Sequence, residues 1–262
     1  MRTWAAFLLM AMLPMPVFAQ DPRPEPRPAE HRPEARPADS PVAVDTPKAD
    51  EPKPEPPEPK VEIPAGPPIS ATLREDDFAY SACLLELTLL GADFDESAPL
   101  TDPDHADCGI ARPITLRAPL PGIQIDGGAV MRCDTARHLA HWLRDFVRPA
   151  TVLLPGQPQL AGLEPGSTYQ CRPTIGNGGE SLSEHAFGNA FDIAAFRFRD
   201  GSRIEITPRQ DDGDLTEAFQ QAVRKTACLH FTTVLGPGAN AAHENHLHLD
   251  IKARKGGFRL CQ

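Results

Sequence analysis

Two short segments carry residue types that suit metal binding. The first, residues 183–192, has the pattern S-x-H-x-x-G-x-A-x-D, with His185 and Asp192 as its ionisable residues. The second, residues 243–250, reads H-E-N-H-L-H-L-D. Imidazole nitrogens and carboxylate oxygens are common zinc ligands in proteins. Together the two segments predict a zinc site to which both contribute.

The second segment has the alternation of a β-strand. Successive side chains of a strand point to opposite faces, so His246, His248 and Asp250 would share one face and the intervening leucines the other. Two imidazoles and a carboxylate on one face suit a divalent metal, with Asp250 orienting a ligand ring. Taken alone, a His-x-His pair is also typical of an edge strand with a solvated polar face.

The first segment predicts a carboxylate at the edge of a buried strand. Gly188 and Ala190 are small, as expected where backbone closes around a site. Asp192 is followed by an apolar run from Ile193 to Phe196. A buried carboxylate without a partner is costly, and a metal ion would supply that partner. The alternative is a loop-to-strand junction in which Asp192 only accepts backbone hydrogen bonds.

Residues 71–262 have a globular composition and suffice for one hydrophobic core. Apolar spacing predicts helices over 77–90, 134–146 and 214–229, the last opened by Asp214 and Glu217 at capping-box spacing. Strand-like runs occur at 113–117, 122–125, 191–198, 204–207, 231–235 and 246–251. We therefore predict an α+β domain in which a small antiparallel sheet carries the zinc site and helices flank it.

The N-terminal region reads as an export signal followed by a spacer. Residues 1–19 combine Arg2, an apolar run over 5–12 and a small-x-small cleavage site ending at Ala19. That run is too short to span a bilayer, which favours removal over a retained transmembrane anchor. Residues 20–70 are proline-rich and charged, so we predict a disordered, polyproline-II-like spacer, whether active tether or passive linker.

The cysteines predict a domain stapled by disulfides. All six follow the predicted signal, at Cys83, Cys108, Cys133, Cys171, Cys228 and Cys261. An even number of cysteines in an oxidising compartment favours three disulfides. A thiolate metal site is disfavoured, because the sequence contains no Cys-x-x-Cys pair. Neighbourhood along the chain favours Cys83–Cys108, Cys133–Cys171 and Cys228–Cys261. The net charge of -10 argues against nucleic acid as a partner. The sequence is silent on oligomeric state.

These motifs resemble a known superfamily. The pattern S-x-H-x-x-G-x-A-x-D followed by His-x-His resembles the lysostaphin, D-Ala-D-Ala metallopeptidase and hedgehog zinc proteins. More closely, Y-Q-C-R at 169–172, L-S-E-H at 182–185, V-L-G-P-G at 234–238 and H-x-x-H-x-H-x-D at 243–250 resemble the bacterial extensin-like C-terminal domain. With the cysteine positions, this resemblance covers roughly Cys83 to Cys261.

The resemblance implies a zinc ion held by His185, Asp192 and His248, with water as the fourth ligand. It implies a catalytic role for His246, which would hydrogen-bond the water or the developing oxyanion. D-Ala-D-Ala peptidases have Glu and Trp where this chain has Asn245 and Leu247. Glu244 would face the opposite side of a regular strand, so a histidine-assisted mechanism of the lysostaphin type fits better.

The resemblance also implies that Ser183 and Arg172 hold a substrate carboxylate, with a surface ion pair as the alternative for Arg172. The function expected is a zinc-dependent peptidase of the periplasm or cell wall. It would act on peptidoglycan peptides, as a carboxypeptidase or an endopeptidase. The alternative is a non-catalytic wall-binding or structural module that keeps zinc for stability.

Overall fold

The computed structural model describes residues 66–175, 181–209 and 212–262. The predicted signal peptide (1–19) and most of the predicted spacer (20–70) lie outside the described residues. The short helix α1 (Ile69–Thr72) begins inside the predicted spacer, so regular structure starts slightly earlier than expected. No helix within the described ranges is long and apolar enough to cross a membrane.

A seven-stranded sheet organises the domain, in the order β12-β10-β11-β8-β7-β5 with β9 added to β8. Its strands are β5 (Gln124–Ile125), β7 (Leu160–Pro165), β8 (Ala190–Phe198), β9 (Arg203–Glu205), β10 (Thr233–Leu235), β11 (Leu247–Asp250) and β12 (Leu260–Cys261). The central pairs are antiparallel, as predicted. The pairs β5–β7 and β10–β12 are parallel, so the sheet is larger than predicted and mixed at both ends.

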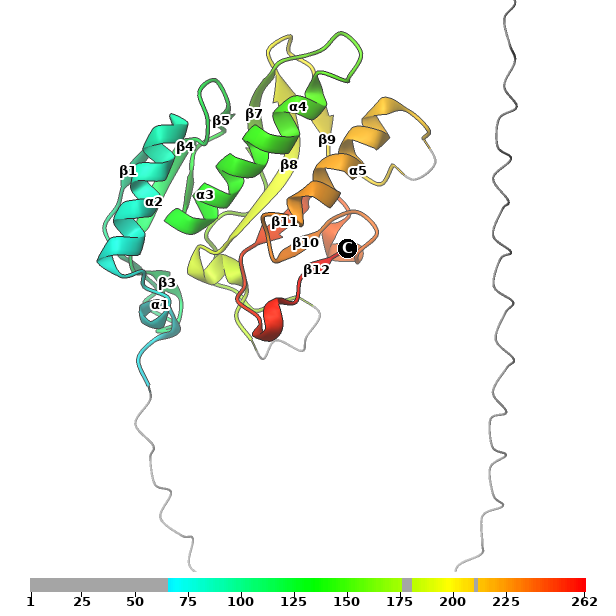
Figure 1. The fold of residues 1–262 in the computed structure, drawn as a ribbon. Helices are drawn as coiled ribbons and strands as arrows, with labels where there is room; N and C mark the ends of the chain where they lie inside the picture. The colour runs from blue at the N-terminus through cyan, green and yellow to red at the C-terminus, as the bar shows by residue number, and fades with distance from the viewer. Residues whose placement is uncertain (1–65, 176–180, 210–211) are drawn as a thin grey trace, which may run out of the picture. The chain divides into compact units, whose positions relative to one another are not determined.

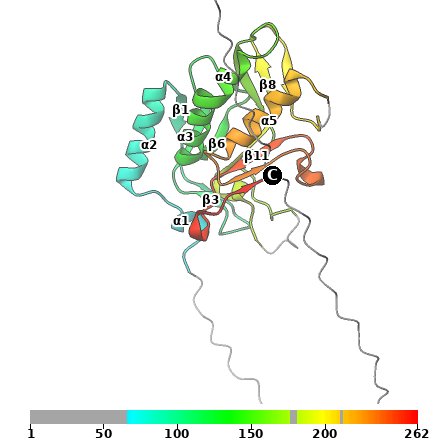
Figure 2. The same cartoon turned by 45° about the vertical axis from the view of Figure 1, so that its right-hand side comes forward.

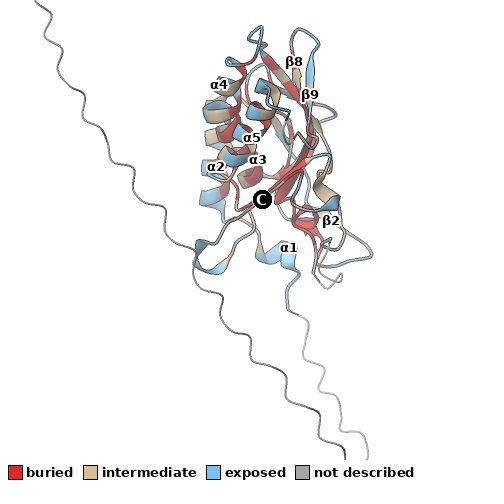
Figure 3. Cartoon of the chain, turned by 90° about the vertical axis from the view of Figure 1, so that its right-hand side faces the viewer, coloured by how far each residue is buried: buried red, intermediate tan, exposed pale blue. Residues whose placement is uncertain are grey.

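Two smaller sheets and a layer of helices complete the fold. The smaller sheets contain β1 (Asp93–Glu96), β4 (Pro113–Ala118) and β6 (Ala129–Arg132), and β2 (Leu100–Thr101) with β3 (Gly109–Ile110). The helices are α2 (Asp77–Leu90), α3 (Cys133–Trp142), α4 (Arg148–Thr151) and α5 (Leu215–Ala227). Figures 1 and 2 show α3 and α5 over the sheet, and Figure 3 shows the helices as one layer against the buried strands. The predicted α+β class is confirmed.

Capping residues explain both ends of α2 and the start of α5. The Asp76 carboxylate accepts from the Ala79 N–H at 2.8 Å, and Gly91 ends α2 in the left-handed conformation, so the helix predicted over 77–90 is confirmed. Asp214 accepts from the Glu217 N–H at 2.7 Å at the start of α5. The helix predicted over 134–146 is longer, because a π-helical turn (Leu143–Val147) joins α3 to α4.

Trp142 fixes the helices against the sheet. It is fully buried, with ring centroids 6.3 Å from Phe196 and 6.4 Å from Phe231. Its indole N–H donates to the Val223 carbonyl of α5 at 3.2 Å, so the polar atom is satisfied in the core. Burial of each such large side chain contributes about 1.5–3 kcal/mol. The core therefore holds α3 and α5 against β8.

Three disulfides are present, and no described cysteine is free. The predicted Cys228–Cys261 pair is confirmed. The predicted Cys83–Cys108 and Cys133–Cys171 pairs are wrong, because the bonds are Cys83–Cys133 and Cys108–Cys171. Cys83 lies in α2, which packs against α3 and so meets that helix's first residue. Cys108 instead packs with Cys171 beside Phe187.

Peptide mapping under non-reducing conditions should recover fragments that join Cys83 to Cys133 and Cys108 to Cys171. Replacement of both members of the Cys108–Cys171 bond by Ser should lower the free energy of unfolding by about 2–5 kcal/mol, because the open chain gains entropy. Denaturant titration measures this loss. A fragment that joins Cys83 to Cys108 would contradict the assignment.

Candidate metal centre

Strand pairing places Asp192 beside His248. The two residues are direct partners in the antiparallel pair β8–β11, so their side chains lie on the same face of the sheet. The flanking partners, Leu247 with Ile193 and Leu249 with Phe191, pack into the core. The predicted alternation of β11 is therefore correct for Leu247 to Asp250, and it leaves His248 and Asp250 on the polar face.

A 3₁₀ turn (Glu184–Phe187) brings His185 to the same place. The Ser183 hydroxyl accepts from the His185 N–H, and Gly188 ends the turn at a positive φ of 67°. A Cβ atom at Gly188 would lie 2.4 Å from Ile110 Cδ1, so both the conformation and the space require glycine. The small residue predicted at this position thus allows close approach of the backbone.

Three potential ligand atoms converge. His185 Nε2 lies 3.2 Å from His248 Nδ1 and 3.2 Å from Asp192 Oδ1, and the last two atoms are 2.8 Å apart. All three residues are buried. Tetrahedral ligands about 2.0–2.2 Å from a zinc ion lie roughly 3.3 Å from one another. His185, Asp192 and His248 therefore form a group that could hold a metal ion.

Hydrogen bonds on the outer nitrogens direct the inner nitrogens of His185 and His248 toward Asp192. His185 Nδ1 lies 2.6 Å from the Thr168 carbonyl oxygen, to which it must donate. His248 Nε2 donates to Asp250 Oδ2 at 3.2 Å, so Asp250 lies where it could orient this ring. If both rings are neutral, His185 Nε2 and His248 Nδ1 each direct a lone pair at Asp192 Oδ1. This arrangement is repulsive unless a cation or an extra proton lies between the three atoms. The donor set therefore fits a metal.

The pKa values show how strongly the group attracts positive charge. Burial alone would lower the pKa of His248, but hydrogen bonds to Asp192 and Asp250 raise it to about 9. Burial alone would raise the pKa of Asp192, but the adjacent His185 and His248 rings hold it well below its usual range. The group thus attracts positive charge, as a cation site requires.

Metal affinity should fall as the pH is lowered. Below a pKa of about 9, binding must displace the His248 proton, so affinity should drop about tenfold per pH unit for each proton displaced. Competition against a chromophoric chelator at pH 6, 7 and 8 measures this, and proton release can be followed in weak buffer. Affinity that does not change over this range would contradict the assignment of His248 as a ligand.

His246 lies next to this group, but not in the strand predicted over 246–251, because β11 begins at Leu247. Its Nε2 is 3.7 Å from Asp192 Oδ2, and its Nδ1 is 3.0 Å from Asn245 Oδ1. The Asn245 oxygen can only accept, so Nδ1 carries the proton and Nε2 faces the metal group unprotonated. Burial lowers the pKa of His246, which keeps the ring neutral near pH 7.

His243 is a neighbour that the sequence did not single out as functional. Its ring centroid lies 5.1 Å from that of His246 and 5.6 Å from that of His248. Burial, followed by the nearby histidines, lowers its pKa to about 4. Glu244 terminates the 3₁₀ turn Ala241–His243, so the strand alternation used to place its side chain does not apply. The only sequence feature that could have indicated a role for His243 is its place beside two other histidines in residues 243–250.

A cleft of about 330 Å³ opens beside His248. Its lining includes both predicted substrate-binding residues, Ser183 and Arg172, together with His243, Asp250 and Lys252. The Ser183 side chain is buried and caps the turn that carries His185. The Arg172 guanidinium donates to Gln170 Oε1 and to the Pro173 carbonyl. No carboxylate pairs with Arg172 in the described part of the chain, so the ion-pair alternative finds no support there.

A buried chain of charged and polar side chains supports the 3₁₀ turn. Asn189 Nδ2 donates to Glu184 Oε2 at 2.7 Å, and Arg132 Nη1 donates to Asn189 Oδ1 at 2.8 Å. Arg132 also pairs with Glu75 at 2.7 Å, and their side chains are 13% and 6% exposed. Buried groups of this kind are stable only when each has its partner. This network, which the sequence did not reveal, ties the His185 turn to β6 and the start of α2.

Replacement of Arg132 by Met should weaken the metal group from a distance. Glu75 and the Asn189 oxygen would lose their buried partner, at a cost of about 3–5 kcal/mol in the free energy of unfolding. Metal affinity should fall, because the His185 turn loses its support. The control variant Arg148→Met should keep the affinity of the wild type, because Arg148 is exposed. Chelator competition and denaturant titration test both. Equal metal affinity in the two variants would remove the positioning role of Arg132.

The fold and the site describe a disulfide-stapled α+β domain with a buried His-Asp-His group. Residues 81–262 match the family described as extensin-like protein C-terminus, and the chain belongs to that family. The predicted resemblance is confirmed at this level. No curated protein sequence and no solved structure matches the chain.

Proposed function

We propose that this protein is a zinc-dependent peptidase that acts on peptidoglycan peptides in the periplasm or at the cell wall. The observation that carries the proposal is the convergence of three buried acceptor atoms, from His185, Asp192 and His248, beside an open cleft. The predicted export signal and three disulfides support an extracytoplasmic location. The resemblance of the motifs to zinc peptidases supports the reaction type.

The residues around the group would divide the work. A bound zinc ion supplies a Lewis acid that activates water and polarises a peptide carbonyl. His246 would accept a proton at Nε2, because Asn245 holds the proton of this ring on Nδ1. Arg172, whose guanidinium bonds only to neutral oxygens among the described residues that line or adjoin the cleft, would bind a carboxylate of the peptide.

One observation favours a second candidate, a non-catalytic wall-binding or structural module. His185 is completely buried, and Asp192 and His248 are 2% and 8% exposed. Closed sites of this kind suit a metal that stabilises the fold. The cleft beside His248, and the position of His246 Nε2 3.7 Å from Asp192 Oδ2, favour the peptidase over the module, because a structural site needs neither.

Metal content and muropeptide release separate the two candidates. His248→Ala removes a ligand, so zinc and activity should both disappear. His246→Ala keeps the three ligands, so zinc should stay near one equivalent while turnover falls about a hundredfold or more. His230→Ala is the matched control, because this histidine stacks on His141 and lies outside the metal group.

Purified cell wall incubated with the zinc-loaded protein, with and without chelator, gives the readout by mass spectrometry. No release by the wild type would sink the peptidase proposal and leave the module. Full activity in His246→Ala would remove only the role of that histidine. Loss of zinc in His246→Ala would show that His246 is itself a ligand.

A further inference from the structure

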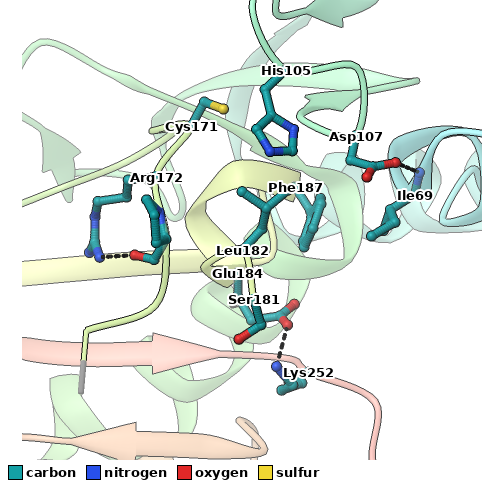
Figure 4. A pocket seen from close by; sticks show the side chains of 11 residues that line it. Ile69, His105, Asp107, Cys171, Arg172, Ser181, Leu182, Glu184, Phe187 and Lys252 are labelled. Carbon is teal, nitrogen blue, oxygen red and sulfur yellow. Dashed lines mark hydrogen bonds and ion pairs between the residues drawn. The ribbon is translucent and has the colours of Figure 1, made fainter. Parts of the chain in front are cut away.

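A second cleft has a volume of about 460 Å³ (Figure 4). It adjoins the cleft beside His248, because the two share lining residues. Both clefts are lined by Arg172, Glu184 and Lys252, so these residues form the boundary between them. A ligand that reaches from the metal group into the second cleft must pass this boundary. The second cleft is therefore placed to hold a part of a bound peptide that lies away from the bond under attack.

The boundary has an excess of positive charge. Lys252 Nζ lies 3.1 Å from Glu184 Oε1, and the Lys252 side chain is 41% exposed while that of Glu184 is only 10% exposed. The other Glu184 oxygen is occupied by Asn189. Arg172 adds a guanidinium that no carboxylate of the described residues neutralises. Two cations against one carboxylate, in a chain with a net charge of -10, favour an anionic group here.

The middle of the second cleft is apolar, and its far end is acidic. Ile69, Leu182 and Phe187 line the cleft, and in Figure 4 Phe187 and Leu182 lie between Lys252 and the pair His105 and Asp107. Asp107 Oδ1 accepts from the Ile69 N–H at 3.0 Å. Its second oxygen has no hydrogen-bond partner in the described ranges. The cleft thus runs from cationic, through apolar, to anionic.

This order of charges has a chemical counterpart. We propose that the second cleft binds a linear diamino acid residue of the peptide, and this inference rests on the proposed function. The carboxylate of that residue faces Arg172 and Lys252. Its methylene chain covers Phe187 and Leu182, because apolar surface gains from leaving water. Its terminal ammonium bonds to Asp107, beside which the His105 ring also lines the cleft.

Binding of small probes tests the proposal apart from any hydrolysis. The probes are Nα-acetyl-lysine, Nα-acetyl-norleucine and Nα-acetyl-lysine amide, titrated into the zinc-loaded full chain and followed by NMR. We expect the lysine acid to bind about tenfold more tightly than either analogue, since each analogue lacks one charge-assisted hydrogen bond. Equal affinities for the lysine and norleucine acids would overturn the proposal.

Two variants assign the contacts. Asp107→Asn keeps an oxygen for the Ile69 N–H but loses the charge, so the preference for lysine over norleucine should vanish while norleucine binding stays the same. Arg172→Gln should weaken both acids about tenfold and leave the amide unchanged. Arg148→Gln, an exposed arginine that lines neither cleft, is the control. A preference that survives in Asp107→Asn would overturn the proposal.

The two proposals fail separately. Lysine preference without muropeptide release would leave the binding site intact and reject the peptidase. Muropeptide release without any lysine preference would keep the peptidase and reject this subsite. Unfolding midpoints of the variants close to that of the wild type establish that a lost preference reflects a lost contact.

Discussion

The arrangement of the domain depends on one electrostatic constraint, the placement of Asp192 directly opposite His248 in the centre of a buried sheet. A carboxylate removed from water is costly unless positive charge accompanies it. The chain meets this cost by surrounding Asp192 with imidazoles whose outer nitrogens are already bonded to Thr168 and Asp250. The contacts that stabilise the buried Asp192 carboxylate also make this group attract a cation.

The supports of this constraint come from distant parts of the sequence. The loop after β7 supplies the Thr168 carbonyl, and Gly166 lies so close to Asp192 that an added Cβ would come within 2.9 Å of the Asp192 Cβ. From the other side, Arg132 and Glu75 hold Asn189, and Asn189 holds the turn that carries His185. His185 and Asp192 are thus supported by segments distant in sequence, whereas His248 is held by Asp250 of its own strand.

The parts of the site that could be predicted are those encoded locally. Leucines alternate with His248 and Asp250, so the face of β11 could be inferred from the period of a strand. The Asp214 cap of α5 and the small residue at Gly188 also act within a few positions. Contacts between distant segments have no such signal, and for that reason the Arg132 network and two disulfide pairings were missed. A bulge in β8 at Ala194 also breaks the simple alternation there and lets both Ile193 and Phe196 pack in the core.

The connectivity of the disulfides has a consequence for how the chain matures. Cys83 bonds to Cys133 and Cys108 to Cys171, so the two loops interleave rather than follow one another. A chain that is oxidised as it emerges N-terminus first presents Cys83 and Cys108 together before Cys133 is available. Oxidation in that order would join Cys83 to Cys108, and attack by a free thiolate through a mixed disulfide would then be required to form the native pair. The native pairing of these interleaved loops thus depends on folding or on thiol exchange, and not on the order in which the cysteines emerge.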